Sequence, residues 1–186
     1  MKNAVALVLM CVFLSGCSDG DQALDTGMEL RSKLLKAETI SFRMDISADH
    51  GETLDLFSMD CTVDPEGAIS FTITAPDTIS GITGMLAGDT GTLTFDDVAL
   101  CFPMVAQNQI SPVSAPWLLV KTLRNGYLRS AGMEEDVLRL TFDNSYEEDA
   151  LQVDIWLNQN NLPHRAEVLC EGRKILSLDV RNFEIL

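Results

Sequence analysis

The sequence predicts an α+β domain in which helices cover one face of a large antiparallel sheet. Apolar and polar residues alternate along most of the chain, which is the period of strands that bury one face. Two segments depart from this alternation in the manner of helices, and short connections rich in Gly, Asp, Asn and Pro separate the strands. We expect about nine or ten strands and two helices in a single domain.

The first helix is predicted at residues 24–35. Its apolar residues, from Leu24 and Met28 to Leu35, fall within an arc of roughly 160 degrees, so we expect that face to pack on the domain. Alternation follows in three segments between Ile40 and Ala75. Residues 64–67 separate two of them, with Pro at the second and Gly at the fourth position of a turn. This pattern predicts an antiparallel meander.

The middle of the chain predicts another hairpin and the second helix. Residues 82–86 and 92–95 flank a turn that contains Gly and Asp, and apolar alternation continues through 98–102. Ser114 is a suitable N-cap, Pro residues are common in a first helical turn, and Gly126 is a suitable end. The helix between these two residues is short and very apolar, so we expect it to be largely covered.

The last third predicts five more strands. In the final one, Leu178 and Val180 share one face and Phe183 lies on the other, so we expect a β-bulge around Asn182. The five strands are predicted within residues 127–131, 137–143, 150–158, 164–171 and 174–185.

Residues 1–16 have the layout of a bacterial lipoprotein signal peptide. Lys2 precedes a run of largely apolar residues that is shorter than the about 20 residues of a transmembrane helix. Small residues then lead into Cys17, in the order Leu-Ser-Gly-Cys, which resembles a lipobox. We expect Cys17 to be the lipidated first residue of the mature protein, followed by a tether at 17–22 and the domain at 23–186. An ordinary signal peptide or a buried helix is the alternative.

Lipidation implies a place in the cell. Two or more acyl chains, such as palmitate, hold a protein stably at a bilayer. We therefore expect the chain to be attached to the cell membrane and to face the extracytoplasmic side. The formal net charge of -15, from 28 acidic and 13 basic residues, disfavours binding to nucleic acid.

The remaining cysteines are odd in number. Cys61, Cys101 and Cys170 lie in apolar runs and lack the spacing of a zinc knuckle or a redox CxxC motif. Buried free thiols are the interpretation that we favour, and one disulfide among the three is the alternative.

The sequence predicts no enzyme activity, no cofactor and no metal site. His50 falls in a predicted turn and His164 at a strand start, where surface positions are more common than a general base. The acidic clusters 134–136 and 147–149 lack the alternating spacing of a calcium loop. We expect both clusters to be solvated loops.

The remaining functional candidate is an apolar groove. Two helices are a modest cover for so large a sheet, and a concave apolar face under a partial lid leaves a groove. The pleat allows only one of Trp156 and its neighbour Ile155 to face inward. The alternative is that these side chains form a filled core. The candidate lining residues are Phe42, Met44, Phe57, Met59, Phe71, Trp117, Leu140, Phe142 and Trp156.

The closing segment carries a family resemblance. It runs Val-Asp-Ile-Trp-Leu at 153–157, a polar turn, Leu162-Pro163, and later Val-Arg-Asn-Phe at 180–183. This arrangement resembles the end of the lipoprotein-carrier family with the LolA/LolB-like fold, including lipoproteins of spore-forming Gram-positive bacteria. The likeness is specific over about 35 residues and otherwise rests on the order of elements.

That resemblance implies an antiparallel half-barrel of about nine to eleven strands covered by two or three helices. It also implies a hydrophobic cavity, which holds acyl chains in some members and supports protein contacts in others. Our first hypothesis is a non-enzymatic, membrane-anchored module that binds lipid, an acyl chain or another apolar ligand in the cell envelope. The alternative is a partner or regulator of an envelope or cell-wall enzyme, such as a sporulation or germination amidase.

Overall fold

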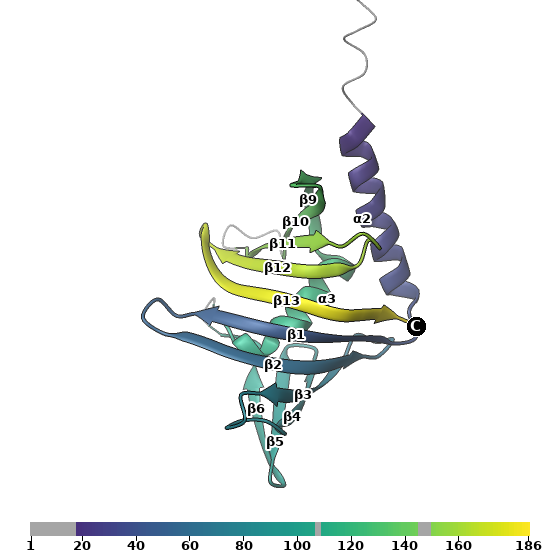
Figure 1. Ribbon diagram of the computed structural model, residues 1–186. Coiled ribbons are helices and arrows are strands. Elements are labelled where there is room, and N and C mark those ends of the chain that lie inside the picture. The colour runs from purple at the N-terminus through teal and green to yellow at the C-terminus, as the bar shows by residue number, and fades with distance from the viewer. Residues whose placement is uncertain (1–17, 107–108, 145–149) are drawn as a thin grey trace, which may run out of the picture.

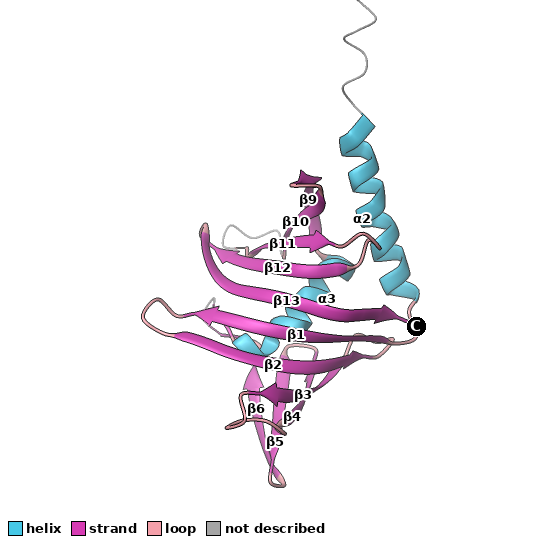
Figure 2. Ribbon diagram, in the orientation of Figure 1, coloured by secondary structure: helices cyan, strands magenta, loops and turns pink. Residues whose placement is uncertain are grey.

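A large open sheet dominates the structure, a computed structural model that describes residues 18–106, 109–144 and 150–186 (Figure 1). The sheet has 11 strands in the order β6-β5-β4-β3-β2-β1-β13-β12-β11-β10-β9, with edges at β6 and β9. Neighbouring strands are antiparallel, and α3 lies behind the central strands in Figure 2. The predicted α+β class and half-barrel sheet are confirmed.

The elements have the following bounds. The helices are α2 (Ser18–Lys36) and α3 (Ala115–Asn125), the latter preceded by a 3-10 helix at Pro112–Ser114. A separate small sheet pairs β7 (Val105–Ala106) with β8 (Gln109–Ile110). The strands of the large sheet are β1 (Ile40–Asp49), β2 (Leu54–Val63), β3 (Ile69–Ala75), β4 (Thr83–Ala87), β5 (Thr90–Phe95), β6 (Val98–Pro103), β9 (Tyr127–Glu134), β10 (Val137–Asp143), β11 (Gln152–Leu157), β12 (Pro163–Cys170) and β13 (Arg173–Ile185).

Two meanders meet at the centre of the sheet. β1 to β6 follow one another on one side, and β9 to β13 follow one another on the other. The halves join where β1 pairs with β13, so the first and last strands of the domain lie side by side. Every other pairing in the large sheet joins strands that follow one another in the sequence, which is the arrangement that alternation and turn residues predicted for most of it. The expected continuation of the strand at 92–95 through 98–102 was wrong, because the chain turns at Asp96 and Asp97 and forms the separate strand β6.

The predicted bulge in the last strand is confirmed. Asn182 has φ 51°, and the register between β1 and β13 shifts opposite Phe42. The extra residue returns Phe183 to the covered face, where its ring stacks on that of Phe42 with centroids 5.4 Å apart. The bulge therefore lets β13 keep burying apolar side chains after the alternation changes phase.

Helix α2 begins at Ser18, earlier in the chain than residue 24, where the apolar spacing predicts its start. The added turns hold small and polar residues, which carry no apolar stripe. Asp21 lies in this first part of the helix, where a carboxylate complements the helix dipole. Ser18 is also the first residue that the structure describes, and Cys17 lies outside the described residues.

The predicted packing face of α2 was partly wrong. Leu30 and Leu34 are buried, but Leu24, Met28 and Leu35 are exposed. The helix turns instead toward its small residues: a Cβ on Gly27 would lie 3.1 Å from Leu140 Cδ2. Close backbone approach at this glycine rotates the larger residues of the predicted stripe outward.

Helix α3 packs across the concave side of the sheet and is buried almost all around, as its composition predicts. Ser114 precedes it as predicted, but it has helical dihedral angles and its side chain makes no capping hydrogen bond. Gly126 follows the helix with an extended backbone, and its N–H donates to the carbonyl of Thr122 at 2.7 Å. The predicted helix ends are therefore right, although neither is capped by the expected geometry.

The three predicted thiols are free. Cys61 is buried, Cys170 is half-buried and Cys101 is exposed. Burial was therefore predicted correctly for Cys61 but not for Cys101. Across the described residues, no helix has the length and apolar character needed to span a membrane.

Candidate functional site: the apolar face of the half-barrel

The covered part of the apolar face lies between the sheet and α3. Most of the residues that the sequence suggests as a groove lining pack here in one hydrophobic cluster. Phe57 packs at the margin of this cluster and is only partly buried. The buried ones are Phe42, Met44, Met59, Phe71, Trp117, Leu140 and Phe142. These side chains contact one another and α3 as parts of the domain core.

Ile155 and Trp156 face opposite sides of the sheet. Ile155 pairs with Leu140 and Ala166 and is fully buried on the covered face. Trp156 pairs with Arg139 and Arg165 on the outer face, where its ring lies between the two guanidinium groups. Of the two neighbours, Ile155 is the one that contributes to the apolar face.

Buried polar atoms accompany the covering helix. Ser114 Oγ, Thr122 Oγ1 and Arg124 Nε have no hydrogen-bond partner within the described part of the chain. Burial also lowers the pKa of Arg124, an effect that the charge of Asp64 opposes. An unpaired buried polar group costs about 1–3 kcal/mol, so these groups oppose the burial of α3. The helix is held by its apolar side chains and by hydrogen bonds that Arg31 of α2 donates to the carbonyls of Leu123 and Gly126.

The same apolar face continues beyond α3 along strands β5 and β6. Gly91, Leu93 and Phe95 of β5 pair with Phe102, Leu100 and Val98 of β6, so alternate residues of both strands share this face. We call Leu93, Phe95, Val98, Leu100 and Phe102 the arm patch. Leu93 and Phe102 are half-buried, whereas Phe95 is 56%, Val98 69% and Leu100 62% exposed. The apolar face is therefore covered at its centre and open at this end.

The arm patch stands on a closely packed base. A Cβ on Gly91 would lie 2.2 Å from the ring of Phe102, and a Cβ on Gly84 would lie 2.4 Å from the ring of Phe71. Each ring therefore lies directly on the backbone of the neighbouring strand, in space that only glycine leaves free. This packing fixes the position of β6 against β5 and of β4 against β3.

The two edges of the sheet differ. β9 packs against α2, and it carries the charged residues Arg129 and Glu134. β6 forms the opposite edge, contains no charged residue, and is exposed at every position except Phe102. In Figure 1 the strands β4 to β6 extend away from the rest of the sheet. Edge strands are usually protected by charges or by a covering element, and β6 has neither among the described residues.

Negative charge gathers at the tip of the arm patch. No Lys or Arg occurs in the sequence from Met44 to Val120, a stretch in which Asp and Glu recur. Asp96 and Asp97 form the turn between β5 and β6. Asp89, in the turn before β5, instead lies near Lys121 and Arg124 of α3. The end of the apolar face at the β5–β6 turn is therefore the end that carries negative charge.

An open groove lies between α2 and the turns at one end of β10 and β11. Met133, Leu138 and Leu157 contribute much of its exposed surface, but polar and charged residues such as His164 and Glu135 are interspersed among them. Such a lining does not provide the continuous apolar wall that an acyl chain requires.

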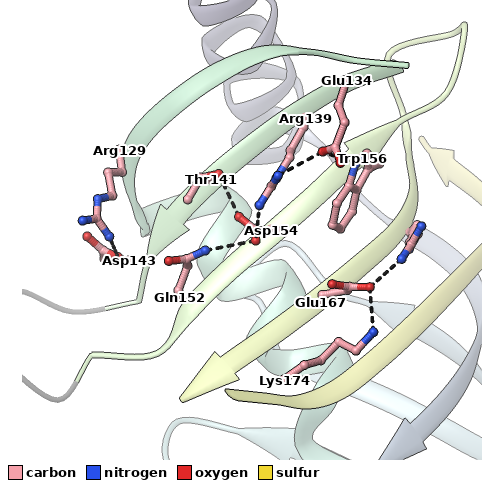
Figure 3. A network of polar contacts seen from close by, with 11 residues as sticks. Arg129, Glu134, Arg139, Thr141, Asp143, Gln152, Asp154, Trp156, Glu167 and Lys174 are labelled. Carbon is pink, nitrogen blue, oxygen red and sulfur yellow. Dashed lines mark hydrogen bonds and ion pairs between the residues drawn. The ribbon is translucent and has the colours of Figure 1, made fainter. Parts of the chain in front are cut away.

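A polar network occupies the outer face of β9 to β13 (Figure 3). The carboxylate of Asp154, 2% exposed, accepts hydrogen bonds from Arg139 Nη2 at 2.7 Å, Thr141 Oγ1 at 2.7 Å and Gln152 Nε2 at 3.0 Å. Arg139 also donates to the carboxylate of Glu134 at 3.0 Å, and Trp156 Nε1 donates to that Glu134 carboxylate at 3.1 Å. The network ties the strands β9, β10 and β11 together.

The charged groups of this outer face stabilise one another. The hydrogen bond to Asp154 raises the pKa of Arg139, although burial opposes it. Burial acts to raise the pKa of Glu167, but hydrogen bonds and charge from Arg165 and Lys174 outweigh it, and the pKa is lowered. The charged groups pair with one another across neighbouring strands, so the network fixes strand register, although Arg139 Nε lacks a hydrogen-bond partner within the described residues.

Residues suited to metal binding do not converge in the described part of the chain. It contains no group of three or more His, Cys, Asp or Glu side chains placed to hold a metal ion. His50 lies on the surface beside Asp55, with Nε2 3.2 Å from a carboxylate oxygen. Residues 147–149 of the second acidic cluster lie outside the described residues.

Two features of the site were not predicted from the sequence. The exposure of Phe95, Val98 and Leu100 was missed, because their alternation is the same as that of buried strands. The burial of Asp154 was missed because a single polar residue in an apolar strand normally marks the solvent face. The absence of basic residues around the arm was visible in the sequence and is the signal that would have drawn attention to this region.

Comparison with known proteins yields likeness in fold but none in sequence. No family model matches the chain, and no curated protein matches it. A DUF1329 family protein from Desulfovibrio piger has a TM-score of 0.50 and 8% identity, over 90% of this chain and 94% of that chain. A LolA superfamily protein from Nitrosomonas europaea has a TM-score of 0.46 and 12% identity, over 91% and 94%.

A third similar structure is that of the CwlD amidase from Clostridioides difficile in complex with the GerS lipoprotein. One of its chains has a TM-score of 0.47 and 11% identity, over 87% of this chain and 95% of that chain. The resemblance to the lipoprotein-carrier fold is confirmed at the level of the fold, and the fold alone is what these comparisons show.

Proposed function

We propose that this chain is a non-enzymatic binding module, anchored in the cell membrane through lipidated Cys17, that binds a partner protein at the extracytoplasmic side. The observation that carries the proposal is the division of the apolar face. Its centre is packed under α3, whereas Phe95, Val98 and Leu100 are exposed on a rigid base. Exposed apolar side chains grouped in this way are typical of interaction surfaces.

The anchor rests on the sequence of the first 17 residues and on the start of α2. α2 is helical from Ser18, the first described residue, and buries its first side chain at Ala23, so only a short segment of sequence separates Cys17 from the domain. An acyl-modified Cys17 would therefore hold the domain close to the membrane surface. That placement suits a protein that recruits or positions a partner in the envelope rather than a soluble carrier.

Purification of the full-length lipoprotein from its own membranes in mild detergent, followed by native mass spectrometry, tests the proposal. We expect a stoichiometric protein complex. Phe95→Ser should abolish this complex, because the substitution removes the largest of the exposed apolar side chains of the arm patch. Met133→Ser is the matched control, since Met133 is 63% exposed on the opposite edge strand. A protein that is recovered alone, or a complex that Phe95→Ser leaves intact, would contradict the proposal.

A second candidate function is the binding of an acyl chain or another apolar ligand beneath α3. It is favoured by the unpaired polar atoms of Ser114, Thr122 and Arg124, because displacement of the helix from the sheet would let water hydrate them and recover part of the free energy that their burial costs. Displacement would expose the apolar residues that the core now buries.

Thr122→Val tests this candidate, because it removes one unpaired hydroxyl with little change in shape. The variant should be more stable by about 1 kcal/mol in urea unfolding. If α3 must move to admit a ligand, palmitic acid should bind the variant more weakly than the unchanged domain. Equal affinity for the two proteins would contradict displacement of α3, and no binding to either would reject this candidate.

A further inference from the structure

We propose that β6 is a strand-addition site, at which an extended and positively charged segment of an envelope protein pairs with the free edge of the sheet. The proposal deepens the proposed function by naming the kind of partner segment and how it binds. Three observations carry it: the unprotected backbone of β6, the row of apolar side chains beside that backbone, and the negative charge at the β5–β6 turn.

The backbone of β6 offers the hydrogen bonds. Only one side of this strand is paired, with β5, so the alternate N–H and C=O groups of Val98–Pro103 on the other side are directed away from the sheet. Pro103, the one residue here without an N–H, stands at the end of the strand, so it does not interrupt the row. An added antiparallel or parallel strand would satisfy these groups.

The side chains specify what kind of segment fits. Val98, Leu100 and Phe102 lie on the concave face of β6, next to Leu93 and Phe95 of β5. A strand added at this edge would place every second side chain on the same face, against Val98 and Leu100. The segment should therefore have apolar residues at alternate positions. Because Phe102 is packed on Gly91, the platform is formed before the partner arrives, which lowers the entropic cost of binding.

The charges disfavour a second copy of this chain as the strand that pairs with β6. With a net charge of -15 and no Lys or Arg from Met44 to Val120, two arms brought together edge to edge would repel each other. Asp96 and Asp97 lie at one end of β6, where they would attract Lys or Arg of a partner segment. A basic, alternately apolar strand satisfies the backbone, the apolar face and the charge together.

The experiment uses three short synthetic peptides and the lipoprotein in detergent. In the first peptide Val alternates with Lys, in the second Val alternates with Glu, and the third is the Val and Lys peptide with N-methyl groups on alternate residues. N-methylation leaves composition and charge unchanged but removes the N–H groups that pair with a strand edge. Binding is measured by fluorescence anisotropy, and by protection of the exposed thiol of Cys101 on β6 from alkylation.

We expect the Val and Lys peptide to bind and to protect Cys101, and the other two peptides to bind at least about tenfold more weakly. Leu100→Lys should weaken binding of the first peptide by about tenfold or more, because it places a like charge beside the peptide. Met133→Lys, at the other edge, should leave binding unchanged.

Four outcomes would overturn strand addition. The first two are binding of the N-methylated peptide, or of the Glu peptide, as tightly as the Val and Lys peptide. The third is dimer formation in analytical ultracentrifugation that Leu100→Lys abolishes. The fourth is binding of the arm to phosphatidylcholine vesicles in place of the peptide. The failure of strand addition is distinguishable from that of the proposed function. A stoichiometric protein complex that depends on Phe95 but forms without peptide binding contradicts strand addition alone.

Discussion

Replacement of Asp154 by Ala should lower the free energy of unfolding by about 2–3 kcal/mol. The carboxylate is 2% exposed and accepts three hydrogen bonds, one of them from the guanidinium of Arg139 at 2.7 Å. Removing one partner of a fully buried ion pair costs about 3–5 kcal/mol. The cost should be smaller here, because Arg139 is 36% exposed and keeps its contact with Glu134.

Urea unfolding of the mature domain, followed by tryptophan fluorescence, measures this difference. Asp143→Ala is the matched control: it lies on the neighbouring strand β10, and its partner Arg129 is 60% exposed at 3.6 Å. An exposed pair contributes less than about 1 kcal/mol, so the control should be nearly as stable as the unchanged domain. Two variants that unfold at the same urea concentration would refute the view that the Asp154 network holds β9 to β11 together.

Three further predictions concern the anchor, a buried thiol and the last strand. Cys17→Ala should abolish membrane attachment in cell fractionation or prevent cleavage of the signal peptide. Normal cleavage together with unchanged attachment would contradict the lipobox assignment. Burial, with a smaller contribution from Asp60, raises the pKa of the Cys61 thiol, so stability should fall as pH rises above about 8.5, where the thiol of the unfolded chain ionises first. Urea unfolding at pH 8 and pH 10 should show this loss in the unchanged domain and a smaller one in Cys61→Ala. Phe183→Ala should cost about 3 kcal/mol, since it removes the ring stacked on Phe42, and a cost similar to that of an exposed residue would contradict the bulge geometry.

The strands were predictable because the alternation of side chains is a local property. The bulge at Asn182 was visible for the same reason, as a change in the phase of alternation between Val180 and Phe183. The packing face of α2 was not predictable in this way, because hydrophobicity alone selects Leu and Met as the buried residues and passes over Gly27. Which stripe of a helix is buried depends on how closely its backbone approaches a neighbour, and that distance is set by residues remote in sequence.

The candidate site shows the same limit. Alternation placed Val98, Leu100 and Phe102 on one face, which is correct, but it treated them as a continuation of the strand at 92–95. The structure instead turns the chain at Asp96 and Asp97 and pairs β6 with β5, and alternation does not say whether anything covers their shared face. Cover depends on where α3 (Ala115–Asn125) lies, and Phe95, Val98 and Leu100 are left exposed beyond it. The burial of Asp154 was unpredictable for a similar reason. Asp154 lies next to the paired residues Arg139 and Trp156 on the outer face, and this pairing between β10 and β11 is not visible in the sequence of one strand.

The positions of the two sheet edges relate the anchor to the binding surface. α2, which follows Cys17 in the sequence, packs against β9, and β6 is separated from β9 by the full width of the sheet. A lipid on Cys17 would therefore hold the β9 edge toward the membrane and leave the β6 edge at a distance from it. Anionic lipid headgroups would also repel the acidic arm and favour this orientation. A partner would then reach β6 from the envelope space rather than from within the bilayer.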